Sequence, residues 1–231
     1  PRMIEVLAAV MNYAEKRKFS SLNYKTIPSI YHQHPAGEDL YALFRSGADL
    51  VRRDLLSVVE MSSRLPYQTR RSRMIKRANN ADLEVHESGE WARFWPLLEA
   101  MLQEQHGVTP VHNLAEIIKL YELFPKSVRL FLCQSRGDIL AGSVIFDTHM
   151  VAHAQYIMNS RIGRESGALD FLFDHLLDRV FNKKRYFDFG SSSVNDGHSL
   201  NMGLVNYKEG FGARAFVHDF YRLNFECRPC I

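Results

Sequence analysis

The chain has 231 residues, of which 46% are hydrophobic and 24% are charged. This composition is ordinary for a folded protein and excludes the disordered and fibrous classes, and the length suffices for a large core without disulfide or metal crosslinks. The 29 basic and 26 acidic residues give a formal net charge of only +3, which argues against a dedicated nucleic-acid binder and makes DNA an unexpected partner.

The first 80 residues show two helix–strand pairs followed by a connecting helix. Apolar residues at helical spacing indicate the helices, and extended patterns indicate the strands. Pro28 confines the first strand to a sheet edge or to its own end. In chain order, the predicted elements are a helix over 3–17, a strand over 21–31, a helix over 37–46, a strand over 49–60 and a helix rich in arginine and lysine over 64–80.

The rest of the chain alternates strands and helices in a second pattern. Asn113 followed by Glu116 predicts a capped helix start, and Pro125 ends that helix. Segments 163–168 and 191–199 are rich in small and polar residues and are predicted loops. The predicted elements are a strand over 83–87, helices over 89–105 and 113–124, strands over 128–134, 139–148 and 151–160, a helix over 168–181, a strand over 186–190, a helix over 200–209 and a strand over 214–225.

The order helix, strand, helix, strand occurs at both ends of the chain, over 3–60 and again over 168–225. FRSGADL (Phe44–Leu50) resembles YKEGFGAR (Tyr207–Arg214), and the matching glycines lie 163 residues apart (210 − 47 = 163). We expect an internal duplication in which residues 1–62 are the second half of a domain whose first half is absent. The alternative is chance, because many α/β chains repeat such orders. The start inside a helical pattern indicates a fragment or a processed chain.

The order of elements over 83–225 is similar to that of the GNAT acyltransferases. NYKEGFGAR (Asn206–Arg214) resembles their C-terminal signature, and the basic helix RSRMIKRANNADLEV (Arg71–Val85) resembles the joint between the two GNAT-like halves of Fem-type aminoacyltransferases. Five segments together resemble a Fem-related group of bacterial GNAT proteins that is often found beside polysaccharide or cell-envelope genes. These segments are PVHNLAEI, AGSVIF, QYI, YFDFGSSS and LNMGLVNYKEGFGAR.

This resemblance implies a fold and a domain organisation. The fold is mixed α/β (α+β) and GNAT-like, with a central, mostly antiparallel sheet flanked by helices and a partial second GNAT-like half. The implied parts are a partial GNAT-like domain over 1–62, the basic connecting helix over 63–80 and a GNAT-like acyltransferase domain over 81–231.

The segment RIGRESGAL (Arg161–Leu169) stands where GNAT members that use acetyl-CoA hold its pyrophosphate through backbone N–H groups and a helix dipole. The pattern is incomplete, because Leu169 falls where a small residue is wanted. Fem-type enzymes, which use aminoacyl-tRNA, also lack a clean version. The resemblance therefore implies acetyl-CoA or another acyl-CoA as cofactor, with tRNA as the alternative. The residues expected to bind the cofactor are Arg161, Gly163, Arg164, Ser166, Gly167 and Ala168.

Three residues are candidates for proton transfer. The resemblance places Tyr207 on the last helix, where GNAT enzymes often carry a phenol that protonates the leaving thiolate, and a phenol with a pKa near 10 suits that role. The alternative is a tyrosine that only packs. His112 and Glu116 lie four positions apart across a helix start. They either act on an acceptor amine as base and orienter or form only a helix cap.

Polar residues near the last strands are candidates for substrate binding. Strand alternation puts His153 and Tyr156 on opposite faces, so that only one of them faces a cleft. Asp188 follows the alternation toward the loop at Ser191, where it either binds substrate or caps the loop. Basic side chains suit a phosphate or carboxylate. The expected substrate-binding residues are Tyr156, Asp188, Ser191, Asn201, Lys208 and Arg214, and we expect the polar loops to meet the 161–168 segment at one end of the sheet.

These observations favour an N-acyltransferase. It would transfer an acetyl or aminoacyl group to an amine of a small-molecule, glycan or peptide acceptor, in cell-envelope or polysaccharide biosynthesis. Two alternatives stay open. One is a catalytically inactive GNAT-like module for binding or assembly, since fold does not fix function. The other is a Fem-type transferase that uses aminoacyl-tRNA and contacts it through the basic helix.

The sequence argues against a metal site and against export. CRPC at 227–230 has no second cysteine pair, and none of the ten histidines pairs at HExxH spacing. Three cysteines do not form a disulfide framework. The chain shows no signal-peptide pattern and no apolar run of the roughly 18 residues that a membrane span needs. A cytoplasmic location is therefore expected.

Overall fold

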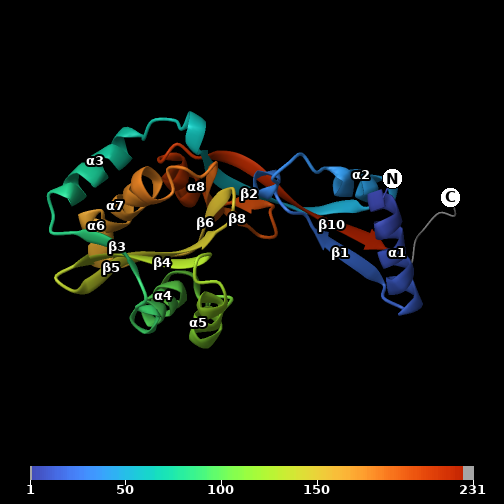
Figure 1. Ribbon diagram of the computed structural model, residues 1–231, viewed down its shortest axis with the longest axis horizontal. Helices are drawn as coiled ribbons and strands as arrows, with labels where there is room; N and C mark the ends of the chain where they lie inside the picture. The colour runs from blue at the N-terminus through green and yellow to red at the C-terminus, as the bar shows by residue number, and fades with distance from the viewer. Residues whose placement is uncertain (1, 226–231) are drawn as a thin grey trace. The chain divides into compact units, whose positions relative to one another are not determined.

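The computed structural model describes residues 2–225 (Figure 1). The helices are α1 (Arg2–Lys16), α2 (Glu38–Arg45), α3 (Thr69–Asn79), α4 (Trp91–His106), α5 (Leu114–Leu123), α6 (Arg161–Ser166), α7 (Ala168–His175) and α8 (Met202–Glu209). The strands are β1 (Ser21–Lys25), β2 (Asp49–Glu60), β3 (Glu84–Ser88), β4 (Val128–Ser135), β5 (Asp138–Asp147), β6 (Val151–Asn159), β7 (Tyr186–Ser191), β8 (Ser193–Val194), β9 (Ser199–Leu200) and β10 (Arg214–Asn224).

Eight strands follow the hydrogen-bonded order β1-β10-β2-β7-β6-β5-β4-β3, and β8 pairs with β9 in a small hairpin. The pairs β1–β10, β3–β4, β4–β5 and β5–β6 are antiparallel, whereas β6 and β7 run parallel. The fold is therefore mixed α/β with a mostly antiparallel sheet, which confirms the predicted class. The expected meander over 128–160 is also confirmed.

The chain forms two compact units, neither of which is continuous in sequence. The first, called unit 1 below, comprises Pro1–Leu56, Ser191–Val205 and Ala215–Ile231. The second, unit 2, comprises Ser57–Gly190 and Asn206–Arg214. The domain boundaries expected at 62 and 80 stay a prediction, as does the duplication, although both expected runs of helix, strand, helix, strand are present.

Unit 1 has a small apolar core of its own. Helices α1 and α2 bury Leu7, Met11 and Leu43 against Leu223 of β10. β1 pairs with β10 from Ser21↔Asn224 to Lys25↔Phe220 and stops before Pro28, as expected for a residue that cannot donate to a ladder. The result is a helix-covered sheet edge.

Unit 2 has one apolar cluster on each face of its sheet. Neighbouring residues of β4 point to opposite faces, as strand alternation requires: Leu130 and Leu132 pack with Trp95 of α4, whereas Phe131 packs with Phe173 of α7. Figure 1 shows α4 and α5 on one side of β4–β6 and α7 on the other. Each face of this sheet is therefore closed by helices, and polar side chains that remain inside it need partners.

Four parts of the predicted pattern are wrong, each for a local reason. The strand predicted over 21–31 ends at Lys25, and Ser29–Tyr31, just after Pro28, form a 3₁₀ turn. The basic helix begins at Thr69 rather than 64, because a 3₁₀ turn (Met61–Ser63) and the chain around Pro66 precede it. The 163–168 segment is not a loop: it contains the end of helix α6, the left-handed cap Gly167 and the first residue of α7. The start of α6 is capped by the Ser160 hydroxyl, which accepts the Gly163 N–H at 3.0 Å. The polar 191–199 segment contains the β8–β9 hairpin, since Gly197 supplies the left-handed backbone (φ +88°) that its turn needs.

Gly163 is a tight contact point of α6, and substituting it should be costly. A Cβ at this position would lie 2.3 Å from the carbonyl oxygen of Leu140 and 2.5 Å from Oδ1 of Asn159. We expect Gly163→Ala to lower the free energy of unfolding by about 1–3 kcal/mol through overpacking, measured by urea denaturation. Gly89→Ala is the matched control, because nothing lies within 4 Å of its Cβ position. Equal effects of the two substitutions would show that α6 is not held here.

Candidate functional site

The parallel pair β6–β7 ends early, and polar side chains gather at its last step. The register runs Val151↔Tyr186, Ala152↔Phe187 and His153↔Asp188. Beyond this point β6 continues to Asn159, but its pairing with β7 has ended. The last pair therefore marks the place where two central strands of unit 2 part, and its two side chains are a histidine and a carboxylate.

Asp188 is the centre of a buried polar cluster. Its side chain is 1% exposed. One oxygen accepts the Gly190 N–H at 2.7 Å, and the other lies 3.0 Å from Nδ1 of His153. The opposite ring nitrogen of His153 lies 3.1 Å from the Gln155 side-chain oxygen. A carboxylate on Nδ1 fixes both the orientation and the tautomer of an imidazole, so Asp188 sets how His153 is presented where the strands part.

Lys208 of α8 completes this cluster from the other side. Its ammonium group donates to the Gly190 carbonyl at 3.0 Å, and the residue is 4% exposed. Burial lowers the pKa of Lys208 to about 8, while the nearby Asp188 carboxylate acts in the opposite direction. At neutral pH the site thus holds a cation and an anion, both removed from water, on either side of Gly190.

The depressed pKa of Lys208 predicts a rise of stability in alkaline solution. The folded state releases this proton near pH 8, whereas the unfolded chain keeps it up to about 10.5. Between these values the unfolded state binds more protons, so the free energy of unfolding increases with pH, by about 3 kcal/mol over the whole interval. Urea denaturation at several pH values should show this rise in the native chain and lose it in Lys208→Met. If the free energy of unfolding rises equally with pH in the two proteins, Lys208 is not the group that releases a proton near pH 8 in the folded state.

The expected alternation of His153 and Tyr156 is wrong, because a β-bulge interrupts the strand. Val144 faces Tyr156 but the next residue, Ile145, faces Ala154, so that Gln155 has no counterpart in the register. Ala154 packs in the cluster under α7, whereas Tyr156 packs with Trp95 under α4. A bulge adds a residue to one strand and shifts the alternation beyond it, which is information that the sequence pattern does not carry.

Tyr156 and His112 form a close pair beside this bulge. The Tyr156 oxygen lies 2.6 Å from Nδ1 of His112 and accepts the His112 backbone N–H at 3.3 Å. Burial raises the pKa of Tyr156, and the backbone N–H groups of His112 and Val111 and the Gln155 side chain act against that rise. The chain thus links the α4–α5 connection to the bulge of β6 through one short hydrogen bond.

Glu116 lies in a helix cap. Its carboxylate accepts the Asn113 N–H at 2.8 Å, and the Asn113 side chain accepts the Glu116 N–H at 2.9 Å. This reciprocal pair confirms the predicted capping box. It fixes the residue that follows His112, so Glu116 contributes to holding the His112–Tyr156 pair in place.

Tyr207 lies in different surroundings from those expected. Its hydroxyl oxygen is closed off from solvent, and the guanidinium of Arg71 stacks over its ring at 4.5 Å. Arg71 is ion-paired with Asp170 inside the structure. Burial raises the pKa of Tyr207 well above its ordinary value, and Asp170 raises it further. The phenol is therefore a protonated core group, and its catalytic role stays a prediction that this position does not favour.

Half of the expected cofactor residues, Gly163, Gly167 and Ala168, are buried. Ala168 is fully buried, and a Cβ on Gly167 would lie 2.8 Å from the Met74 carbonyl oxygen of α3. The Ser166 hydroxyl donates to the Gly163 carbonyl. Arg161 and Arg164 differ, because both are exposed, the Arg161 side chain to 88%. Arg164 also donates to the Asn159 carbonyl at 3.1 Å. A phosphate here would meet arginine side chains rather than a cradle of backbone N–H groups.

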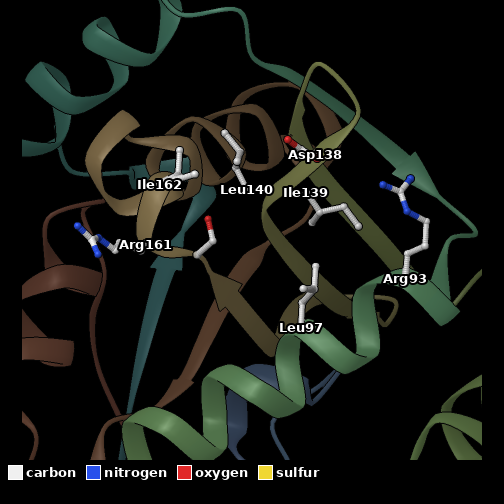
Figure 2. A pocket seen from close by; sticks show the side chains of 8 residues that line it. Arg93, Leu97, Asp138, Ile139, Leu140, Arg161 and Ile162 are labelled. Atoms are coloured by element: carbon white, nitrogen blue, oxygen red, sulfur yellow. The ribbon is translucent and has the colours of Figure 1, made fainter.

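A hollow of about 570 Å³ lies beside Arg161, at the end of β6 (Figure 2). Leu97 of α4 and Ile139, Leu140 and Ile162 give it apolar walls, as Figure 2 shows, with Arg161 and Arg93 set apart from each other at its rim. Apolar walls with a few charged groups are typical of small-molecule sites.

The remaining expected residues are placed as follows. The Ser191 hydroxyl accepts the Ser193 N–H, and Asn201 accepts the Leu204 N–H at the start of α8. Both belong to unit 1, and their expected meeting with the 161–168 segment stays a prediction. Arg214 donates to the Ala213 carbonyl at 2.8 Å. Among the residues that the sequence placed in the site, the structure brings together His112 with Tyr156, and Asp188 with Lys208.

Sequence reasoning did not assign His153 and Gln155 to the site. Both lie on β6 within reach of candidate residues that it did assign. The pattern HAQY at 153–156 carries a weak signal, three polar or amphipathic side chains in a strand whose other residues up to Met158 are apolar. The decisive fact, the last pairing step His153↔Asp188, joins residues 35 positions apart and is not encoded in either segment alone.

Within residues 2–225, no group of three or more His, Cys, Asp or Glu side chains forms a metal cluster. In the same range no helix is both long and apolar enough to cross a bilayer. Cys133 is buried, and burial raises its pKa to about 12. Cys227 and Cys230 lie outside the described residues.

No protein-family model and no curated protein matches the sequence. Solved structures do resemble the fold. FemX matches with a TM-score of 0.69 at 11% identity, over 96% of this chain and 77% of that one. L-PGS from Bacillus licheniformis matches with a TM-score of 0.68 at 14% identity, over 96% of this chain and 73% of that one. A third match is the C-terminal domain of a putative lysylphosphatidylglycerol synthetase from Agrobacterium fabrum. Its TM-score is 0.63 at 13% identity, over 94% of this chain and 72% of that one. At such identities the likeness shows the fold alone, which is similar to that of FemX.

Proposed function

We propose that this Fem-like, GNAT-related fold carries an acyltransferase that joins an activated acyl or aminoacyl group to an amine. The observation that supports this most is the last pairing step of β6 and β7, His153↔Asp188, with Lys208 buried beside it. A row of oriented polar groups at the point where two central strands part is suited to hold a reacting carbonyl away from water.

The bulge of β6 supplies a second part of the proposed site. Gln155 has no counterpart in the β5 register, and a backbone position of this kind can direct an N–H toward an oxyanion. An amine attacking the acyl carbonyl would develop negative charge on the carbonyl oxygen. The rate would come from this stabilisation and from holding both substrates in one orientation.

The donor would bind at the hollow of Figure 2. Its apolar walls suit an acyl or pantetheine chain, and Arg161 and Arg93 suit phosphates. The inward packing of Gly167 and Ala168 removes the usual backbone cradle and favours aminoacyl-tRNA as a second candidate donor. The proposed acceptor is an amine of a glycan, peptide or small molecule in cell-envelope or polysaccharide biosynthesis, and the proposed location is the cytoplasm.

The direct test offers each donor to the purified chain. Acetyl-CoA and alanyl-tRNA are incubated with an amino sugar and with a lysine-containing peptide, and the amide is detected by mass spectrometry. Amide formed from acetyl-CoA identifies a CoA-dependent enzyme, and amide formed from alanyl-tRNA an aminoacyl-tRNA-dependent one. If neither donor is consumed with either acceptor, the acyltransferase proposal is wrong and a binding or assembly module replaces it.

Arg161→Ala tests the placement of the donor. If Arg161 holds donor phosphate, its loss should raise KM for the donor about tenfold with little change of kcat, since one charge-assisted contact of about 1.5 kcal/mol is removed from ground state and transition state alike. Arg136→Ala is the matched control, because Arg136 is 86% exposed and lies outside the hollow. An unchanged KM, or equal changes in both variants, would move the donor site elsewhere.

A further inference from the structure

The geometry points to His112 and Tyr156 as one proton-donating unit. In this unit His112 protonates the leaving group, and Tyr156 holds the His112 ring in position and gives it a proton in turn. This inference rests on the proposed acyl transfer. It assigns the acid of that reaction to the α4–α5 connection rather than to Tyr207.

The direction of the hydrogen bond between the two residues follows from the other contacts of the phenol. The Tyr156 oxygen accepts the backbone N–H groups of His112 and of Val111. The Gln155 side chain also forms a hydrogen bond to this oxygen, and all three contacts lower the pKa of the phenol. The phenol's own proton is then left for Nδ1 of His112, 2.6 Å away. A neutral His112 that accepts at Nδ1 must carry its proton on Nε2.

Both rings are held in position. The Tyr156 ring packs edge-to-face on Trp95, with centroids 5.1 Å apart, and its backbone carbonyl accepts the Ser143 hydroxyl at 2.9 Å. The capping box at Asn113 fixes the backbone next to His112. Tyr156 is 7% exposed whereas His112 is half-buried, so the histidine is the member of the pair that a substrate can reach.

The step balances without any further reagent. The amine nitrogen bonds to the acyl carbon, and the bond from that carbon to the leaving sulfur or oxygen breaks. The Nε2 proton of His112 passes to the leaving atom as the Tyr156 proton moves to Nδ1. The phenolate that results is held by the backbone N–H groups of Val111 and His112. The proton lost by the amine then restores the pair, so no net charge remains on the protein.

Tyr207 does not offer these features. Its hydroxyl is closed off from solvent and lies beside the Arg71–Asp170 ion pair. A proton there has no path to a leaving group that enters from outside. His112, by contrast, lies on an exposed connection that also carries Val111, which is 84% exposed.

The test combines a spectroscopic readout with turnover. Nitrogen-15 NMR of His112 at about pH 8, where an ordinary imidazole is neutral, should show the proton on Nε2 in the native chain, and this preference should be lost in Tyr156→Phe. With the donor that is consumed, Tyr156→Phe should lower kcat about 10- to 100-fold, His112→Gln at least as much, and the double variant no more than the worse single variant. Tyr121→Phe is the matched control, because Tyr121 packs on Trp91 in the same apolar cluster.

The outcomes separate this inference from the function on which it rests. A proton on Nδ1 of His112 in the native chain would overturn the unit, as would additive effects of the two substitutions or a Tyr156→Phe protein with native kcat. A native chain that shows the Nε2 proton but forms amide from neither donor would overturn the acyl transfer, and with it the delivery step, while leaving the measured hydrogen bond intact.

Discussion

Asp188→Ala should lower the free energy of unfolding by about 3–5 kcal/mol, because it removes one partner of a buried charge pair. The carboxylate accepts the Gly190 N–H and faces both His153 and the buried Lys208 ammonium. Without it, the N–H has lost its acceptor and the pKa of Lys208 falls further, since a nearby negative charge that favours its protonation is gone. Urea denaturation at neutral pH measures the loss.

A conservative variant separates charge from hydrogen bonding. Asp188→Asn keeps an oxygen for the Gly190 N–H but removes the charge, so it should lose less stability than Asp188→Ala while reducing any acyl transfer as strongly. Asp82→Ala is the control, because Asp82 is a carboxylate of the same unit that is 74% exposed, and we expect a change within about 0.5 kcal/mol there. If Asp188→Ala is no more harmful than Asp82→Ala, the buried cluster does not contribute to the fold.

Arg71→Met should be the second large effect, with a loss of about 3–5 kcal/mol at neutral pH, since it leaves Asp170 buried without its cation. Burial already raises the pKa of Asp170, and Arg71 is the main influence that lowers it. A carboxyl group with a raised folded-state pKa costs stability when it ionises, so its favourable contribution is present in acid and is lost as pH rises through that pKa. Removing Arg71 raises the pKa of Asp170 further and so increases the stability that is lost when Asp170 ionises.

The penalty of Arg71→Met should therefore shrink on acidification from neutral pH to about pH 4, where an ordinary aspartate is half protonated. Denaturation of native and variant protein at both pH values gives the comparison. Asp170→Asn added to Arg71→Met should recover part of the loss, because the unpaired charge is then absent. Arg73→Met is the control, because Arg73 is an exposed arginine of the same helix α3. A penalty independent of pH would mean that lost packing on Tyr207 and Phe211, not charge, dominates.

Local patterns in the sequence predict most helices and strands of this fold. The helix start at Asn113 was readable because its cap is made within four residues, and the strands over 128–160 were readable because short turns join them. By contrast, the sequence predicts a loop over 163–168, where the structure has the end of α6. Its start depends on Ser160 and its buried glycine on contacts with Leu140, which lies 23 positions earlier.

The candidate site was foretold only in part, and the reason is geometric. The sequence predicts Asp188 and Lys208 as substrate-binding residues without predicting that they meet, and the structure shows both buried near Gly190. Tyr156 could not be placed on its face, because the bulge at Gln155 depends on how β5 and β6 pair. The sequence predicts Arg71 only as part of a basic helix, and nothing local indicates that it turns inward to Asp170, 99 positions away.

The chain passes four times between unit 1 and unit 2, and this route affects how the protein is made. Unit 1 needs β10, whose pairing joins Ser21 to Asn224 across 203 positions (224 − 21 = 203). During synthesis from the N-terminus, β1 must wait for almost the whole chain before its partner leaves the ribosome, whereas the antiparallel strands β3–β6 of unit 2 meet their partners within a few dozen residues. Such long-range closure is slow. Unit 1 should therefore form last, and chaperones that shield nascent apolar segments would act mainly on its first two helices.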